Sequence, residues 1–423
     1  MKKYVFLLLL TILPTLVMAQ VSGGQITRPS NKQQNMQNRS GKSSNNRSNP
    51  KVIREVYYES TLSVEERKVW EEEKAKAKER MRLLAYNLKL QQLKPNGNFY
   101  NGLARCNRGY IDKKGNLVIR SDNFWENNFH NGYAKIEKER KWGVIDKTGN
   151  VIIPINYDWV GDLSEGVFCV QQRNQIAYIN EKGALTIPFK WERCHDEGEN
   201  FSEGYAGVCK DRKCGFIDKT GSVVISFEYD HVRQFREGLA PVEKNGKWGY
   251  IDINGKTVIP FVYDHAYSFN CGLGRVEKNG KEGFVNEKGE VVIPINYGCE
   301  GFAMVNDFKE DIVLVGNNQN SKNKWGYMNK QGKYIITPQF YEAEDFSEGL
   351  ACVAIRNSMN QCKYGFINRK GEIVIPFKFV IDNINYEFSE GMAFIQIYGG
   401  HNSAGEVKIG GFVDKYGNST FDF

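Results

Sequence analysis

The sequence predicts an all-β protein, a tandem array of about nine antiparallel repeats with three strands each. Closely similar segments recur along its 423 residues, as in "RKWGVIDKTGNVIIPINYD" (140–158) and "GKWGYIDINGKTVIPFVYD" (246–264). The commonest spacing between copies is 34 residues, and this regularity indicates a repeat architecture. Each copy carries a first glycine, replaced once by Ala177, and a second glycine six residues later. The first glycines, which we interpret as structural, are Gly109, Gly143, Gly215, Gly249, Gly283, Gly326, Gly365 and Gly411.

Each repeat divides into three strands joined by short turns. In one copy, residues 239–244 alternate as a first strand and Asn245-Gly246 forms a two-residue turn that needs positive φ angles. Residues 247–253 form the second strand, and a glycine in the next turn closes a bulge. Residues 257–259 form the third strand, which we expect Pro260 to end because proline has no N–H to donate.

We expect the units to stack as an open β solenoid, with a closed, propeller-like ring as the alternative. The array begins with a first strand and ends with a third strand, so no unit is split between the two ends of the chain. Propeller blades also usually have four strands rather than three. Both features favour the open arrangement.

Residues 1–19 have the pattern of a signal peptide. Lys2 and Lys3 precede an apolar run at 5–13, and small residues up to Ala19 form a cleavage site. The apolar run is too short to cross a bilayer as a helix of about 20 residues. We therefore expect an exported protein, periplasmic, on the cell surface or secreted, with no stable membrane insertion after cleavage.

Residues 20–60 are rich in Asn, Ser, Gln and Arg, which predicts a disordered basic linker. This linker and the signal peptide account for the whole formal charge of +7, so the remainder is close to neutral. A near-neutral repeat domain argues against nucleic acid as a partner.

An amphipathic helix is predicted at 61–94, before the repeat domain at 95–423. Ser63 and Glu66 form a capping box at its start, and apolar residues follow near helical spacing. We expect this helix to cover the exposed edge of the first repeat. A dimerising coiled coil is the alternative, although the apolar pattern is short and irregular for one.

The repeated segments resemble the WG repeat, also called the KWG repeat, of bacterial proteins. Lys141-Trp142-Gly143, Lys247-Trp248-Gly249 and Lys324-Trp325-Gly326 carry the resemblance, which extends over about 103–423. It implies a repeat fold and a binding or scaffold role, and it implies no catalytic residues. In the other copies the tryptophan is replaced, so we interpret the glycine as the backbone requirement and the tryptophan as a packing residue.

Nothing in the sequence indicates catalysis or a cofactor. His231 and His265 recur in step with the repeat, which is typical of packing residues, and no histidine has partners at metal-ligand spacing. Residues 252–255 resemble the start of a calcium loop but lack its remaining ligands, so a turn explains them. We therefore expect a protein that is not an enzyme, with no metal and no cofactor.

One pair of the nine cysteines is placed to form a disulfide. If Asp211-Arg212 is the hairpin turn, Cys209 and Cys214 face each other at a non-hydrogen-bonded position of the antiparallel pair, where the Cα atoms are close. Burial as two packed thiols is the alternative.

The hairpin between the first and second strands lengthens in the last three repeats. Equivalent hairpins of neighbouring repeats leave the array on the same face, so the three enlarged tips predict a polar recognition surface, with neutral insertion as the alternative. Its candidate residues are Asn317, Asn318, Gln319, Asn320, Asn357, Met359, Asn360, His401 and Asn402. We expect an exported repeat scaffold that binds another protein at the envelope or outside the cell. The alternative is a carbohydrate-binding module, which exposed tryptophans would favour and buried ones would count against.

Overall fold

The computed structural model describes residues 63–120, 125–194, 198–298, 306–317, 324–356, 361–380, 386–402 and 405–420. The predicted signal peptide and linker lie outside these residues. The chain divides into two units, Met1–Leu88 and Lys89–Phe423. Helix α3 (Val64–Leu93) supplies the described part of the first unit. Ser63 N donates to Glu66 Oε2 at 3.1 Å, and Glu66 N donates to Ser63 Oγ at 3.3 Å, as a capping box requires.

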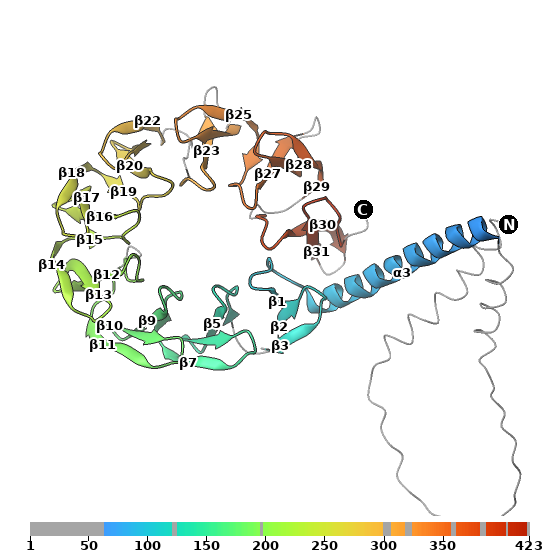
Figure 1. The fold of residues 1–423 in the computed structure, drawn as a ribbon, viewed down its shortest axis with the longest axis horizontal. Coiled ribbons are helices and arrows are strands. Elements are labelled where there is room, and N and C mark those ends of the chain that lie inside the picture. The colour runs from blue at the N-terminus through green and yellow to red at the C-terminus, as the bar shows by residue number, and fades with distance from the viewer. Residues whose placement is uncertain are drawn as a thin grey trace, which may run out of the picture. The chain divides into compact units, whose positions relative to one another are not determined.

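The second unit contains nine antiparallel sheets of two to four strands, one for each repeat (Figure 1). The strands of repeats 1 to 5 are β1 (Leu103–Cys106), β2 (Gly109–Asp112), β3 (Leu117–Arg120), β4 (Trp125–Glu126), β5 (Tyr133–Lys138), β6 (Lys141–Asp146), β7 (Val151–Tyr157), β8 (Trp159–Val160), β9 (Val167–Gln172), β10 (Gln175–Asn180), β11 (Leu185–Trp191), β12 (Tyr205–Lys210), β13 (Lys213–Asp218), β14 (Val223–Tyr229), β15 (His231–Val232), β16 (Leu239–Lys244), β17 (Lys247–Asp252) and β18 (Thr257–Tyr263). Those of repeats 6 to 9 are β19 (His265–Ala266), β20 (Gly274–Lys278), β21 (Lys281–Val285), β22 (Val291–Tyr297), β23 (Ile312–Asn317), β24 (Lys324–Asn329), β25 (Tyr334–Phe340), β26 (Glu342–Ala343), β27 (Leu350–Arg356), β28 (Cys362–Asn368), β29 (Ile373–Phe379), β30 (Met392–Asn402) and β31 (Gly405–Asp414). The predicted array of nine antiparallel β repeats is confirmed.

Five of the nine sheets have a fourth strand that the sequence did not predict. These strands (β4, β8, β15, β19 and β26) have two residues each and come from the connector before the first strand of the repeat. In the fifth repeat, His231 pairs with Glu243 and Val232 with Val242. The prediction of three strands is therefore incomplete, because two residues are too few to show a strand pattern.

The third strand does not end at the proline. Strand β18 continues through Pro260 to Tyr263, with a bulge between the pairs Tyr250↔Ile259 and Trp248↔Tyr263. As an edge strand it tolerates a residue without an N–H donor, so the predicted stop was wrong. The bulge also explains the first glycine. A Cβ on Gly249 would lie 2.6 Å from the carbonyl oxygen of Ile259 and 2.9 Å from the carbonyl carbon of Pro260.

The second glycine has another role. Gly255 has a φ of 77°, which glycine adopts without strain, and the Ile225 side chain of the preceding repeat packs against it. The carboxylate of Asp252 accepts hydrogen bonds from the N–H groups of Asn254 and Lys256 in the same turn. The segment that resembles a calcium loop is therefore an aspartate-closed turn.

Three contacts recur where one repeat meets the next. An aromatic side chain of the second strand packs on a phenylalanine in the connector before the next repeat, as Tyr178 does on Phe201 with ring centroids 4.8 Å apart. The Ser164 hydroxyl donates to the carbonyl oxygen of Phe201 at 2.5 Å. The Glu165 carboxylate accepts from Gly204 N and pairs with Lys219 at 3.1 Å. Buried aromatic pairs and charge-assisted hydrogen bonds are among the stronger contacts of a fold.

The same three contacts join the ninth repeat to the first. Phe412 packs on Phe99 with centroids 4.6 Å apart, and Ser389 Oγ donates to the carbonyl oxygen of Phe99 at 2.6 Å. Glu390 accepts from Gly102 N at 2.9 Å and pairs with Lys113 at 3.1 Å. The nine sheets do not merge into one sheet, but the last repeat lies against the first (Figure 1). This arrangement is the closed ring that the sequence analysis gave as the alternative, and it differs from the open array that was preferred.

The last turn of α3 packs within the repeat unit, where Leu90 is buried and Lys89 Nζ donates to Asn116 at 2.9 Å. No other residue of α3 is buried. The ninth repeat contacts the first, so that edge of the first repeat is not left open, and whether the rest of α3 covers the first repeat stays a prediction. Whether α3 forms a coiled coil remains a prediction.

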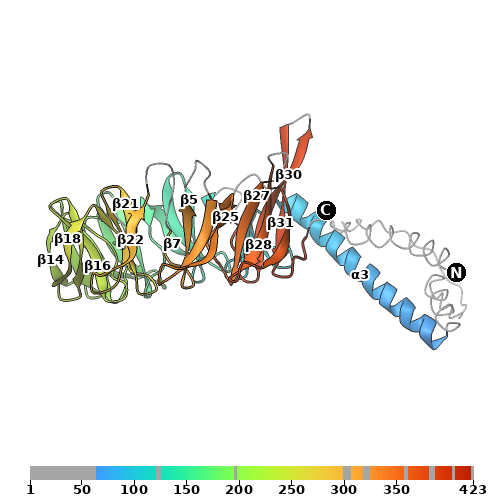
Figure 2. The same cartoon turned by 90° about the horizontal axis from the view of Figure 1, so that it is seen from above.

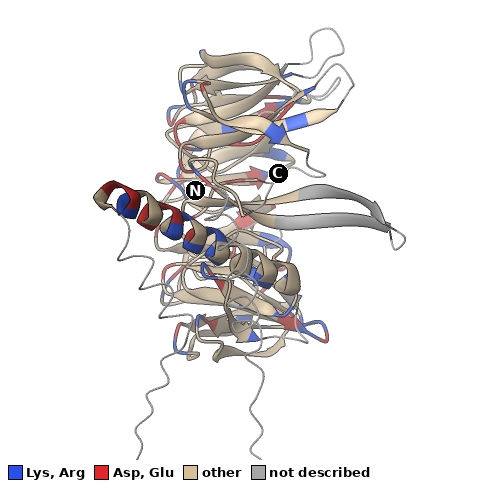
Figure 3. Cartoon of the chain, turned by 90° about the vertical axis from the view of Figure 1, so that its right-hand side faces the viewer, with Lys and Arg blue, Asp and Glu red and all other residues tan. Residues whose placement is uncertain are grey.

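Charged residues of both signs are interspersed along α3 and over the sheets (Figure 3). Among the described residues, no helix combines the length and the apolar character needed to cross a bilayer.

Candidate functional site

The enlarged hairpin tips are at the predicted positions in the array. Strands β23 and β24 flank residues 318–323, and β27 and β28 flank residues 357–360. The candidates Asn318, Gln319, Asn320, Asn357, Met359 and Asn360 lie outside the described residues, and for Asn317, His401 and Asn402 only the backbone is described. Their part in recognition remains a prediction.

The ninth repeat has the longest hairpin. Strands β30 and β31 pair at nine positions, as far as Asn402↔Gly405, whereas the regular pair β16 and β17 has six. The two strands extend beyond the neighbouring sheets (Figure 2). Instead of a loose loop, this insertion is a two-stranded ribbon.

The short hairpins of repeats 3, 5 and 6 are held by an aspartate that follows the third strand of the preceding repeat. Asp264 accepts from Lys247 Nζ at 2.5 Å and from Asn279 N, in the hairpin turn of the next repeat, at 2.6 Å. Asp158 and Asp230 make the same pair of contacts. The hydrogen bond from lysine, followed by the one from the turn N–H, lowers the pKa of Asp158 and Asp264. We call these three aspartates the hairpin clamps.

Each of the three enlarged hairpins lacks a clamp. Gly298, Tyr341 and Val380 occupy the position after the third strand in repeats 6, 7 and 8, where Asp264 stands in repeat 5. None of them has a carboxylate to hold the next hairpin turn. In these three repeats, the longer hairpin coincides with the absence of a clamp.

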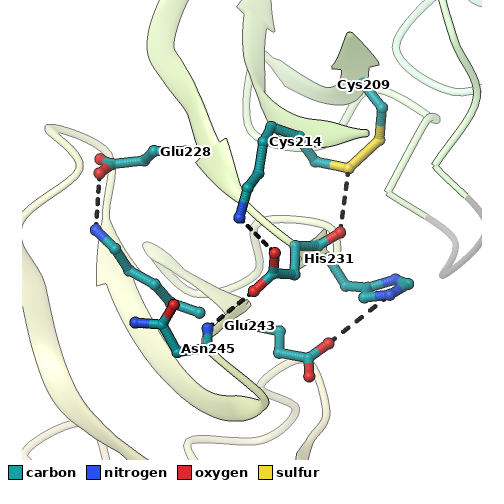
Figure 4. A network of polar contacts seen from close by, with 9 residues as sticks. Cys209, Cys214, Glu228, His231, Glu243 and Asn245 are labelled. Carbon is teal, nitrogen blue, oxygen red and sulfur yellow. Dashed lines mark hydrogen bonds and ion pairs between the residues drawn. A yellow bond between two sulfur atoms is a disulfide. The ribbon is translucent and has the colours of Figure 1, made fainter. Parts of the chain in front are cut away.

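The hairpin of the fourth repeat is held by sulfur. Cys209 and Cys214 pair in register and form a disulfide with a Cα–Cα distance of 4.0 Å. Cys214 Sγ also lies 3.6 Å from the carbonyl oxygen of Asp230. Figure 4 shows the disulfide near Asn245 of the next hairpin turn. The Asp230 carboxylate accepts from Asn245 N and from Lys213 Nζ.

A polar cleft of about 630 Å³ opens where the ends of the array meet. Repeats 1, 2, 7, 8 and 9 line it, with Arg105, Asn128, Lys309, Glu344, Glu387 and Gln396 among the lining residues. Burial, reinforced by the charges of Asp345 and Glu387, raises the pKa of Glu344 to about 7. Sequence reasoning missed this cleft because its residues come together only when the ring closes.

The tryptophans of the repeat do not form an exposed stripe. Trp248 is 3% exposed, and Trp142 and Trp325 are half-buried and pack against the core. This is the outcome that counts against stacking of sugar rings on them. It also supports the interpretation of the tryptophan as a packing residue.

Comparison with known proteins identifies the repeat. The pattern of the WG containing repeat matches residues 109–142, 142–175, 177–214, 215–248, 248–281, 283–298, 325–357 and 364–400. No curated protein matches the chain. Similar solved structures include the computationally designed Ika8 protein (12% identity, covering 66% of this chain and 93% of that one, TM-score 0.41) and a eukaryotic initiation factor (11%, 69%, 84%, 0.47). Another is Hsv2 of Kluyveromyces lactis (8%, 66%, 94%, 0.36). Because the matched repeats span more than half of the chain, the protein belongs to the WG-repeat family.

Proposed function

We propose that this repeat scaffold is exported, is not an enzyme, and binds another protein through the hairpins of its last three repeats. The observation that carries the proposal is the ribbon of β30 and β31. Its outer part, from Tyr398↔Lys408 to Asn402↔Gly405, pairs only with itself among the described residues. Both of its edges therefore present N–H and C=O groups to a partner.

A free strand edge favours a protein over a glycan. An extended peptide can add a strand to such an edge, with main-chain hydrogen bonds for affinity and side chains for specificity. A two-stranded ribbon is marginally stable alone, so a third strand would also stabilise it. The buried Trp248 removes the main argument for a carbohydrate-binding module.

The test compares three trimmed forms of the full chain in capture from cell-envelope fractions. Residues 399–407 of one variant are replaced by Asn-Gly, which keeps the pair Tyr398↔Lys408 in register. The other two carry the same turn in place of 318–323 and 357–361, between the pairs Asn317↔Lys324 and Arg356↔Cys362. The control is Asn245→Asp, which keeps a turn residue that tolerates a positive φ in a regular hairpin.

We expect the ribbon variant to lose affinity for the captured protein by roughly tenfold or more, about 1.4 kcal/mol. The N245D control should bind like the wild type, and circular dichroism should be unchanged in all forms. A partner kept by all three trimmed forms would contradict the proposal. Binding to a glycan panel without capture of a protein would replace it with the carbohydrate alternative.

Export is tested separately. Fractionation of producing cells and N-terminal sequencing should find a form beginning at Gln20 outside the cytoplasm. A full-length cytoplasmic form alone would contradict export and leave the proposed binding surface unaffected.

A further inference from the structure

Three sulfur atoms gather where the connector after repeat 3 meets the hairpin of repeat 4. Cys209 and Cys214 form the disulfide, and Cys194 Sγ lies 3.0 Å from Cys209 Sγ. All three sulfurs lie within 4.8 Å of one another. The three residues are 2%, 7% and 5% exposed for Cys194, Cys209 and Cys214. A third thiol thus touches a buried disulfide.

The backbone fixes this contact. Glu192 N donates to the carbonyl oxygen of Cys209 at 2.8 Å, and Cys209 N donates back to Glu192 at 3.0 Å. Further along the same segment, Gly207 N donates to Gly198 O at 2.7 Å. Cys194 lies between these two attachment points, so its sulfur is held beside strand β12.

We propose that Cys194, Cys209 and Cys214 form an internal thiol–disulfide exchange site. The Cys194 thiol loses its proton and its sulfur attacks Cys209 Sγ. A Cys194–Cys209 bond forms, the Cys209–Cys214 bond breaks, and Cys214 leaves as a thiolate that takes up a proton. One disulfide and one thiol are present before and after the step, so no oxidant or reductant is consumed.

The leaving sulfur has an acceptor in place. Cys214 Sγ lies 3.6 Å from the carbonyl oxygen of Asp230, so the released thiol can donate a hydrogen bond there without moving far (Figure 4). Asp230 is also the clamp of the next hairpin, through Asn245 N at 2.8 Å. Exchange therefore alters the hydrogen bonding beside that clamp.

The two disulfides hold different parts of the fold. The Cys209–Cys214 bond closes a hairpin within repeat 4, and a Cys194–Cys209 bond would tie the connector from repeat 3 to strand β12. Glu192 stands at the clamp position of this connector, and among the described residues its carboxylate makes no hydrogen bond to the hairpin turn. The exchange decides whether the hairpin or the junction between repeats is covalently fixed.

A nearby cysteine takes no part in this site. Cys169 is buried, and burial raises its pKa well above the usual range, so it stays a protonated thiol. It serves as the matched control. Exchange among the other three sulfurs is intramolecular, so it needs no external thiol.

Tryptic mapping separates the two disulfides by mass. Cleavage after Arg193 and Lys210 leaves Cys194 and Cys209 on one peptide, 194–210, and Cys214 on another, 214–219. Purified full-length protein is acid-quenched, its thiols are blocked with N-ethylmaleimide, and it is digested without reduction. The Cys209–Cys214 form gives two linked peptides. The Cys194–Cys209 form gives an internally bridged 194–210 and a blocked 214–219.

We expect both forms in the wild type and in Cys169→Ser. Cys194→Ser should lose the blocked 214–219 peptide completely. Cys214→Ser, treated with oxidised glutathione, should form the internal bridge in 194–210. The proposal is overturned if the wild type yields only the linked peptides 194–210 and 214–219. It is also overturned if Cys194 and Cys209 both still react with N-ethylmaleimide in folded C214S after treatment with oxidised glutathione. It does not depend on the proposed binding function, because none of its residues lies in the last three repeats.

Discussion

The hairpins of repeats 3, 5 and 6 and those of repeats 7, 8 and 9 differ at their ends but not at their bases. In the first group an aspartate such as Asp264 binds both a lysine and the next hairpin turn, and the turns have two residues. In the second group the clamp position holds Gly298, Tyr341 or Val380, and the hairpins are longer. The core beneath both groups is the same. Gly249 and Gly365 would each place a Cβ 2.6 Å from an isoleucine carbonyl oxygen of the bulged third strand.

This difference separates architecture from specialisation. The glycines, the aromatic pairs and the serine and glutamate contacts recur around the ring, and a change to any of them disturbs a junction. The hairpin ends carry no such contact once the clamp is gone, so they can lengthen without cost to the core. A recognition surface is expected there.

The largest predicted loss of stability tests whether the two groups of repeats share the same core packing. Gly249→Ala and Gly365→Ala should each lower the free energy of unfolding by about 3 kcal/mol, because the new methyl group overlaps the backbone of the third strand. Thermal and urea unfolding of both variants would measure it. If Gly365→Ala is much milder than Gly249→Ala, the two groups of repeats differ in their core as well as in their hairpins.

The second effect tests the junctions. Glu390 and Glu165 each accept from the N–H of a neighbouring glycine and pair with a lysine at 3.1 Å, with side chains 30% and 28% exposed. Glu390→Ala and Glu165→Ala should therefore lower the free energy of unfolding by a similar amount, about 1 kcal/mol. If Glu165→Ala lowers the free energy of unfolding and Glu390→Ala leaves it unchanged, the first and ninth repeats do not meet.

A smaller effect concerns the cleft between the ends of the array. Glu344 has a pKa of about 7 in the folded protein against 4.5 as the unperturbed value, mainly because it is buried. The folded protein holds this proton more tightly, so the wild type loses stability as the pH rises from 4.5 to 7. Glu344→Gln should melt at a higher temperature than the wild type at pH 8, with the gap closing as the pH falls toward 4.5. A gap that is constant over this range would contradict the burial of this carboxyl.

The smallest effect concerns a clamp. The hydrogen bond from Lys213 lowers the pKa of Asp230 below its usual 3.8, although partial burial opposes the shift. Its stabilisation is therefore complete above pH 3.8 and is lost as the pH falls through the lowered pKa. Asp230→Asn should cost at most about 1 kcal/mol at neutral pH, and the difference should begin to shrink below pH 3.8 and vanish once the pH is below the lowered pKa. Hydrogen exchange of 243–248 should rise in D230N, and unchanged exchange would contradict the role of Asp230 as a clamp.

The sequence predicts the number of repeats and the features that depend on neighbouring residues, such as turns and hairpin register. The nine units, the Asn245-Gly246 turn and the register of Cys209 with Cys214 follow from spacing and turn chemistry, and each is present in the structure. The two-residue strands are too short to show a period, and the bulge at Pro260 replaces a simple stop. Both depend on the neighbouring strand rather than on local propensity.

Long-range arrangement is what the sequence does not predict. Nothing local in Phe99 or Glu390 distinguishes an end that meets its neighbour from one that faces solvent. Closure depends on the small rotation between successive repeats, summed over nine of them. The cleft around Glu344 could not be predicted because it exists only after closure, whereas the contact of Cys194 with Cys209 depends on a connector of irregular length.

Hydrogen exchange at the junction of repeats 9 and 1 tests the closed ring most directly. Gly102 N donates to Glu390, as Gly204 N does to Glu165 at the junction of repeats 3 and 4. Followed by mass spectrometry in the full-length protein, peptides covering 98–106 and 200–208 should be protected to a similar degree. Glu390→Ala should speed the exchange of the 98–106 peptide and leave that of 200–208 unchanged. Rapid exchange of 98–106 in the wild type, beside a protected 200–208, would show an array with open ends and contradict this account.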